Sequence, residues 1–174
     1  MSDDAPVSSW LLSNVDLIPR AGRALDVACG RGRHALFLAE RGLAVVAVDR
    51  DPAAVAALRA EAARRVLALE ARVADLEAGG PDVGLGEGAY DLVVVVHYLH
   101  RPLFPALLRA MAPGALLLYE TFTEDQARLG KPTNPDFLLR PGELQERLRG
   151  LTILREREGR FEGRHVAAVA ARKP

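Results

Sequence analysis

Two aspartates flank a glycine-rich turn in the first third of the chain, and residues of these types can hold a nucleotide. Asp26 lies in the apolar run 24–28, which leads directly into the turn Gly30-Arg-Gly32. Glycine lets backbone N–H groups approach a polar or anionic ligand closely, and a helix that begins after the turn adds further N–H groups. Asp49 ends a second apolar run, 43–48, where a carboxylate can accept hydrogen bonds from ribose hydroxyls. The pattern predicts a nucleotide-binding loop.

Short apolar runs rich in β-branched residues alternate with longer stretches of helical spacing along most of the chain. The apolar runs predict strands near 23–28, 43–48, 66–74, 90–96 and 114–121. The longer stretches predict helices near 33–41, 52–65, 102–111 and 141–149. Because strands and helices alternate, we expect a doubly wound, Rossmann-like α/β sheet whose strands are mostly parallel.

Three other segments depart from this alternation. Residues 151–158 and 161–171 form two strand-like runs with a turn at Gly159, too close for a helical crossover, so we expect an antiparallel pair that completes a seven-stranded sheet. Residues 1–20 contain a short amphipathic helix over 8–18, which is either a packing helix anchored by Trp10 or a lid over the ligand. Residues 122–141, with three prolines and little periodicity, are expected to form a substrate-side loop.

Composition restricts the classes of protein that fit. A chain of 174 residues, 49% of them hydrophobic, is long enough for one α/β domain and too short for two. The formal net charge of zero disfavours nucleic acid as a partner. The single cysteine cannot form an internal disulfide, the first residues lack the features of a signal peptide, and no apolar run approaches the ~20 residues of a membrane span. We therefore expect a cytoplasmic monomer or homodimer that acts on a small molecule, without a membrane partner.

Five motifs follow one another in order over nearly the whole chain. They are Leu25-Asp26-Val-Ala-Cys-Gly30-Arg-Gly32, Val48-Asp49, Val73-Ala-Asp75-Leu76, Tyr90-Asp91-Leu-Val-Val and Met111-Ala-Pro-Gly114. In this order they resemble the class I S-adenosylmethionine-dependent methyltransferases. The loop Cys29-Gly-Arg-Gly-Arg-His34 and the small size are similar to the tellurite-resistance type of these enzymes. One departure is Ala28, which stands where the family usually has the first glycine of the loop.

The resemblance implies a cofactor, S-adenosylmethionine, whose demethylated product is S-adenosylhomocysteine, and a role for each matching residue. Asp26 would orient the loop and meet the methionine ammonium group, while Asp49 would bind the ribose. Asp75 would accept from the adenine amino group, and the backbone of Leu76 would donate to the adenine ring. The full set of expected cofactor contacts is Asp26, Ala28, Gly30, Gly32, Arg33, Asp49, Arg50, Asp75 and Leu76. The implied reaction is methyl transfer to a small acceptor such as a thiol, a chalcogen oxyanion or another small metabolite.

Two other functions fit parts of the same pattern. Gly30, Gly32 and Ala35 also satisfy the Gly-x-Gly-x-x-Ala fingerprint of dinucleotide-dependent oxidoreductases. Asp26 inside the first strand, Asp75 after the third and the closing antiparallel pair favour a methyltransferase instead. A regulatory protein that binds S-adenosylmethionine without turnover is the second alternative, because this chemistry requires no invariant catalytic residue.

Candidate catalytic residues follow the central strand, at the edge where α/β folds place their ligands. They are His97, Tyr98 and His100. An amine or hydroxyl acceptor would need His97 or His100 as a base, whereas thiolates, oxyanions and carboxylates can attack unaided. Two histidines without further ligands of recognisable spacing do not indicate a metal site. Cys29 is interpreted as a small residue of the loop, not as a nucleophile, since no base is evident beside it.

Overall fold

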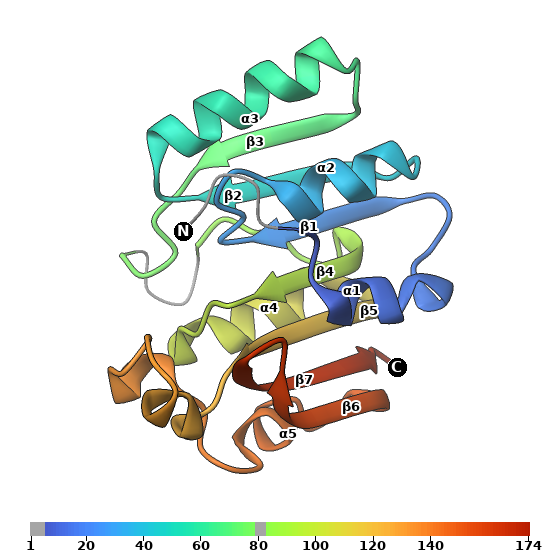
Figure 1. Ribbon diagram of the computed structural model, residues 1–174. Coiled ribbons are helices and arrows are strands. Elements are labelled where there is room, and N and C mark those ends of the chain that lie inside the picture. The colour runs from blue at the N-terminus through green and yellow to red at the C-terminus, as the bar shows by residue number, and fades with distance from the viewer. Residues whose placement is uncertain (1–5, 79–82) are drawn as a thin grey trace.

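The computed structural model describes residues 6–78 and 83–174, and its strands form one seven-stranded sheet (Figure 1). The strands are β1 Arg23–Val27, β2 Ala44–Asp49, β3 Leu69–Val73, β4 Tyr90–Val96, β5 Met111–Phe122, β6 Thr152–Phe161 and β7 Arg164–Arg172. Their order is β3-β2-β1-β4-β5-β7-β6. The first five pair parallel, and β7 runs antiparallel to both β5 and β6. The predicted α/β sheet with its antiparallel C-terminal pair is confirmed.

Helices cover both faces of this sheet because the central strands are apolar on both sides. The helices are α1 Ser9–Ser13, α2 Arg33–Glu40, α3 Pro52–Arg64, α4 Phe104–Ala110 and α5 Glu143–Arg147. Side chains of α1, α2 and α3 pack against one face of the sheet and form an apolar cluster with it. Side chains of α4 and α5 pack against the other face of the sheet and form a second apolar cluster. No described helix is long and apolar enough to cross a membrane.

Helix α3 shows how local sequence sets the length of the elements. Asp51 caps its start by accepting from the N–H of Ala53 at 2.9 Å, and Pro52 occupies the first turn. Its end is marked by Val66, whose φ of +56° is left-handed, with the N–H of Leu67 donating to the carbonyl of Ala62. The predicted strand 66–74 is therefore wrong at its first residues: Val66 belongs to the helix end, and β3 begins at Leu69.

Two other predicted boundaries shift for similar reasons. The turn predicted at Gly159 is wrong, because Gly159 pairs with Val166 inside β6 and the chain reverses at Glu162 and Gly163, both with positive φ. The predicted helix 102–111 begins as a 3-10 turn, Arg101–Leu103, and ends before Met111, which already pairs with Tyr90 as part of β5.

The described part of the N-terminal segment packs against the sheet. Residues 1–5 lie outside the described residues. The predicted helix 8–18 is broken at Asn14 into α1 and a 3-10 turn, Val15–Leu17. The indole of Trp10 is buried and its Nε1–H donates to the carbonyl of Val169 at 3.2 Å. This anchors α1 against the sheet, in front of β5 in Figure 1.

Residues 122–141 lie beyond the end of β5. They contain two 3-10 turns, Glu124–Arg128 and Pro135–Phe137, which the sequence pattern did not predict. A bridge between Thr123 and Leu139 holds the two ends of the segment together. Leu138 and Leu139 are buried, so the segment is fixed to the domain at its end.

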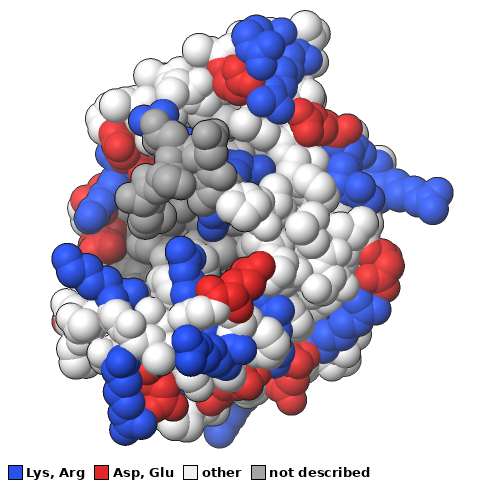
Figure 2. Space-filling view, viewed as in Figure 1, with Lys and Arg blue, Asp and Glu red and all other residues white. Residues whose placement is uncertain are grey.

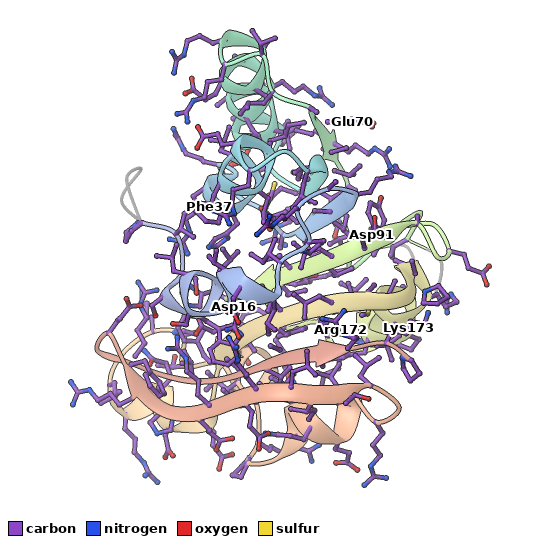
Figure 3. The ribbon with its side chains drawn as sticks, turned by 90° about the vertical axis from the view of Figure 1, so that its right-hand side faces the viewer. Asp16, Phe37, Glu70, Asp91, Arg172 and Lys173 are labelled. Atoms are coloured by element: carbon purple, nitrogen blue, oxygen red, sulfur yellow. The ribbon has the colours of Figure 1, made fainter. Side chains whose placement is uncertain are left out.

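At the edge of the sheet where the parallel strands begin, charged side chains form hydrogen bonds with the backbone. Asp91 accepts from the N–H of Arg23 at 2.8 Å, and the ammonium group of Lys173 donates to the carbonyls of Leu108 and Met111, each at 2.8 Å (Figure 3). On the face shown in Figure 2, Lys and Arg side chains are interspersed with Asp and Glu, in keeping with the net charge of zero. The opposite edge of the sheet, where the parallel strands end, contains the functional candidates.

Candidate cofactor and acceptor site

The parallel strands end on one edge of the sheet, at the left of Figure 1, and this edge gathers most of the predicted site residues. Residues 28–32 form the turn between β1 and α2, and Ala28, Gly30 and Gly32 all have positive φ. A Cβ on Gly32 would lie 2.4 Å from both methyl carbons of Leu58, so only glycine lets the loop pack on α3 here. At Gly30, by contrast, no described atom lies within 4 Å of the place a Cβ would take, so the loop backbone faces open space.

Asp49 joins this loop to the end of β2. One carboxylate oxygen, Oδ2, accepts from the N–H of Gly30 at 2.7 Å, and Oδ1 accepts from the N–H of Asp51 at 2.9 Å. A carboxylate has about four acceptor positions, so two remain for ligand hydroxyls. Asp49 is thus placed both to shape the loop and to bind a diol beside it.

Asp26 is buried at the centre of this edge, with 1% of its surface exposed. Its Oδ2 has no hydrogen-bond partner among the described residues. Burial raises the pKa of Asp26 to about 7, while a hydrogen bond from the Ala35 N–H and the positive charge of Arg33 oppose the rise. A buried carboxylate with an unused acceptor is well suited to a ligand ammonium group.

The ends of β3 and β4 form the next part of the site. Asp75 is exposed, and its Oδ1 accepts from the N–H of Glu77 at 2.9 Å, whereas Leu76 is buried. Tyr98 points its hydroxyl toward Glu77 at 3.5 Å. Burial, followed by the charge of Glu77, raises the pKa of Tyr98, and Arg50 acts in the opposite direction. The charge of Asp75 also raises this pKa, so Asp75, Arg50 and Tyr98 lie in the same part of the site edge.

His97 is held in a strained conformation at the end of β4, with a φ of +58°. Its ring stacks on Phe122 with centroids 4.6 Å apart, and Nδ1 lies 3.3 Å from Nη1 of Arg164. Because a guanidinium only donates, Nδ1 accepts and Nε2 carries the proton. Burial and the charge of Arg164 lower the pKa of His97 to about 4. The ring is neutral at pH 7 and is a weaker base than an ordinary histidine.

His100 and Cys29 are the other two residues near this edge whose side chains the sequence analysis considered for chemistry. His100 lies before the 3-10 turn Arg101–Leu103, and its side chain makes no hydrogen bond within the described part of the chain. Burial and then the charges of Asp26 and Asp49 raise the pKa of Cys29, so its thiol stays protonated. The protonated thiol agrees with the interpretation of Cys29 as a small residue of the loop, and contact of His97, Tyr98 or His100 with a ligand stays a prediction.

The end of β5 contributes a buried carboxylate, Glu120. It accepts from Arg157 Nη2 at 2.5 Å and from the Ser8 hydroxyl at 2.9 Å. The N–H of Ser8 also donates to Nε2 of His34 at 3.2 Å. Because His34 is buried, its pKa falls to about 3 and its ring is neutral. These contacts fasten the start of the N-terminal segment to the site edge.

Arg157, Arg164 and Ser8 were missed in the sequence analysis. Arginine accounts for 21 of the 23 basic residues, so no single arginine stands out. Arg157 and Arg164 reach the site only because β7 inserts between β5 and β6 and brings the β6–β7 hairpin to this edge. The only available signal was the antiparallel pairing itself.

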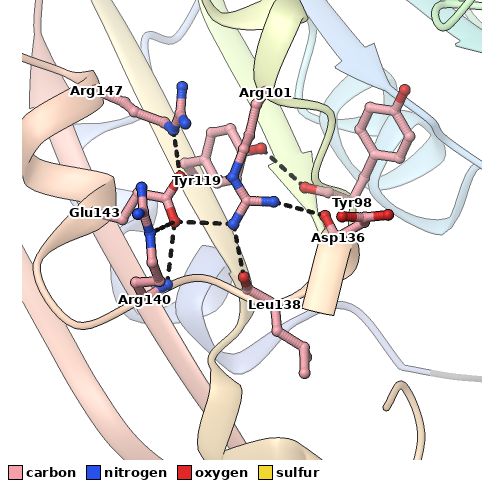
Figure 4. Close-up of polar contacts among 8 residues, drawn as sticks. All are labelled: Tyr98, Arg101, Tyr119, Asp136, Leu138, Arg140, Glu143 and Arg147. Carbon is pink, nitrogen blue, oxygen red and sulfur yellow. Dashed lines mark hydrogen bonds and ion pairs between the residues drawn. The ribbon is translucent and has the colours of Figure 1, made fainter. Parts of the chain in front are cut away.

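A third buried carboxylate, Glu143, fixes the 122–141 segment (Figure 4). Arg101 pairs with both its oxygens, at 2.7 and 2.9 Å, and Arg147 pairs with Oε1 at 2.7 Å. Arg101 also donates to the carbonyls of Asp136 and Leu138, each at 2.8 Å. One arginine therefore joins the segment to α5 and to the chain just after Tyr98 and His100.

Comparison with known proteins agrees with this geometry. A family model described as a methyltransferase domain matches residues 24–114, which is more than half of the chain. The chain therefore belongs to the methyltransferase-domain family, whose cofactor is S-adenosylmethionine. The protein named "Putative methyltransferase YqeM" of Bacillus subtilis (strain 168) is 26% identical over 127 residues, covering 67% of this chain and 49% of YqeM. This chain thus spans about half the length of that curated relative.

Solved structures share the fold. TehB from Haemophilus influenzae superimposes with a TM-score of 0.79 at 20% identity, covering 97% of this chain and 63% of TehB. A SAM-dependent methyltransferase from Aquifex aeolicus superimposes with a TM-score of 0.73 at 17% identity, covering 95% of this chain and 90% of that one. At these identities the likeness establishes the seven-stranded methyltransferase fold.

Proposed function

We propose that this chain binds S-adenosylmethionine at the loop 28–32 and transfers its methyl group to a small-molecule acceptor. The observation that carries the proposal is the pair of unused acceptors, Asp26 Oδ2 and the free positions of Asp49, near the loop whose backbone is open at Gly30. An ammonium group and a ribose diol are donors that match these acceptors. Asp75 and the backbone of Leu76 would hold the adenine.

The chemistry that S-adenosylmethionine supplies when bound is an activated methyl group on a positively charged sulfur. The residues of this chain have the remaining tasks of aligning the acceptor and excluding water. His97 is neutral, with its Nδ1 lone pair directed at Arg164, so it is poorly placed to remove a proton. This favours acceptors that attack without a base, such as thiolates, carboxylates or oxyanions.

We also propose the tellurite-resistance-like subgroup as the nearest branch, in a single domain spanning 1–174 that works in the cytoplasm as a monomer or homodimer. The support is the loop Cys29-Gly-Arg-Gly-Arg-His34, the small size and the TehB-like fold. A chalcogen oxyanion or a thiol is the acceptor class that this branch suggests.

Calorimetric titration of the purified protein, cleared of carried-over ligand, tests the proposal. We expect binding of S-adenosylmethionine and S-adenosylhomocysteine in the micromolar range and no binding of NAD or NADP. Preference for a nicotinamide dinucleotide would overturn the proposal in favour of an oxidoreductase. Binding without methylated product across a panel of thiols, oxyanions and carboxylates would point to a regulatory protein.

The affinity for S-adenosylhomocysteine is expected to depend on pH through Asp26. Only the ionised carboxylate pairs fully with the ligand ammonium, so affinity should fall by about tenfold per pH unit below pH 7, where Asp26 is protonated. The stability of the unliganded protein should depend on pH in the opposite direction. The raised pKa of Asp26 adds to the free energy of unfolding below about pH 4, and this contribution is lost as the pH rises through 7. Titrations at pH 5.5 to 8 should show the slope in the wild type and not in Asp26→Asn, and a slope retained in that variant would exclude Asp26 as its source.

A further inference from the structure

Two arginines at the acceptor side of the site lack carboxylate partners. Arg33, half-buried in the first turn of α2, makes no hydrogen bond or contact ion pair with any described residue. Arg164, at the start of β7, is exposed, and His97 is the only hydrogen-bond partner of its side chain among the described residues. Burial lowers the pKa of Arg33, and the positive charge of Arg164 lowers it further because the two guanidinium groups lie near each other. A partly buried guanidinium is ordinarily paired, but that of Arg33 has no such partner among the described residues, and the exposed Arg164 adds a second positive charge near it, so this arrangement points to a missing anion.

The nearby carboxylates do not supply that anion. Glu120 lies 3.8 Å from Nε2 of His97, but its negative charge is already paired with Arg157, and it also accepts a hydrogen bond from Ser8. Asp26 and Glu162 act on Arg33 only through space, together with Glu120. Glu162 is exposed in the turn between β6 and β7. The unmatched positive charge is therefore that of Arg33 and Arg164.

We propose that Arg164, together with Arg33 and with His97 beside it, binds the anionic group of an acidic acceptor, either a carboxylate or a compact oxyanion. Arg164 gives one N–H to His97, and its remaining donors form a fork that suits such groups. The stacked rings of His97 and Phe122 provide an apolar wall next to this fork. The inference rests on the proposed function, because it defines the acceptor end of the same site.

Calorimetric titration with two probe anions, benzoate and inorganic phosphate, tests this subsite at constant ionic strength. Each is titrated with and without saturating S-adenosylhomocysteine, and benzamide serves as the neutral counterpart of benzoate. We expect one or both anions to bind and benzamide not to bind. Benzoate alone would indicate an organic carboxylate, and phosphate alone a compact oxyanion. No binding of either anion to the wild type, or equal binding of benzamide, would overturn the inference.

Arg164→Gln should lower the affinity for whichever anion binds about tenfold or more and leave the affinity for S-adenosylhomocysteine unchanged. Arg160→Gln is the matched control, because Arg160 lies on the same hairpin, is exposed, and its side chain makes no hydrogen bond or ion pair with a described residue. An equal loss in both variants would show a general effect of charge and would reject a local site.

Arg33 has a second possible anion, the carboxylate of the cofactor itself. Arg33→Gln is therefore titrated with S-adenosylhomocysteine and with methylthioadenosine, which lacks the amino-acid end. Weaker anion binding with unchanged S-adenosylhomocysteine affinity supports the acceptor subsite. A loss confined to S-adenosylhomocysteine would assign Arg33 to the cofactor and overturn its part in the inference. Failure of the wild type to bind S-adenosylhomocysteine would refute the proposed function, whereas the anion titrations without it still test the subsite.

Discussion

Asp49→Ala is expected to weaken binding of S-adenosylhomocysteine by roughly 2–4 kcal/mol, the value of two charge-assisted hydrogen bonds with partial replacement by water. The structure adds a second reason for the loss, since Asp49 Oδ2 also holds the N–H of Gly30 at 2.7 Å. Removing the carboxylate therefore removes the ribose acceptor and releases the loop together. Calorimetric titration of wild type and variant measures the difference.

Two further variants separate these contributions. Asp49→Asn keeps one oxygen that can accept from Gly30 but loses the charge, so its affinity should lie between those of wild type and Asp49→Ala. Asp51→Ala has the same change in charge two residues away and removes only the α3 cap. It should lower the free energy of unfolding by about 1 kcal/mol and leave ligand affinity intact. Wild-type affinity in Asp49→Ala would exclude Asp49 from the cofactor site.

Glu143→Ala is expected to lower the free energy of unfolding by about 2–4 kcal/mol. This is less than the loss expected when a fully buried ion pair is broken, because the arginines that pair with Glu143 are partly exposed. The Glu143 side chain is 2% exposed, and its loss leaves Arg101 and Arg147 without their shared carboxylate. Chemical denaturation at pH 7 measures the change. Thermal unfolding should also reveal a looser 122–141 segment, because Arg101 joins Glu143 to Asp136 and Leu138.

The same carboxylate predicts a pH dependence of stability. Hydrogen bonds from Arg101 and other partners hold the pKa of Glu143 well below its usual value of 4.5. Its contribution is therefore complete above about pH 5 and is lost as the solution is acidified below the unfolded pKa. Glu146→Ala, in the same helix but exposed, should leave stability nearly unchanged. If the two variants unfold alike, the Glu143 network contributes little to stability.

Local sequence was sufficient for the order of the elements and for the position of the candidate cofactor loop. Apolar runs of β-branched residues predicted the parallel strands, and the strand-to-glycine-turn pattern located Asp26, Gly30 and Asp49, because these residues act close to their own strand ends. Boundaries were wrong where a single backbone conformation decided them. Val66 ends α3 with a positive φ, and Gly159 continues a strand that its residue type suggested would turn.

The residues of the proposed acceptor subsite were brought together by tertiary structure alone. Arg157 and Arg164 lie on the last two strands, and only the insertion of β7 beside β5 brings them to His97 and Glu120. Burial, which no sequence pattern measures, makes His97 neutral and raises the pKa of Asp26. Local patterns determine which residues end a strand, whereas the charges that meet across the edge depend on how distant strands pair and how much water they exclude.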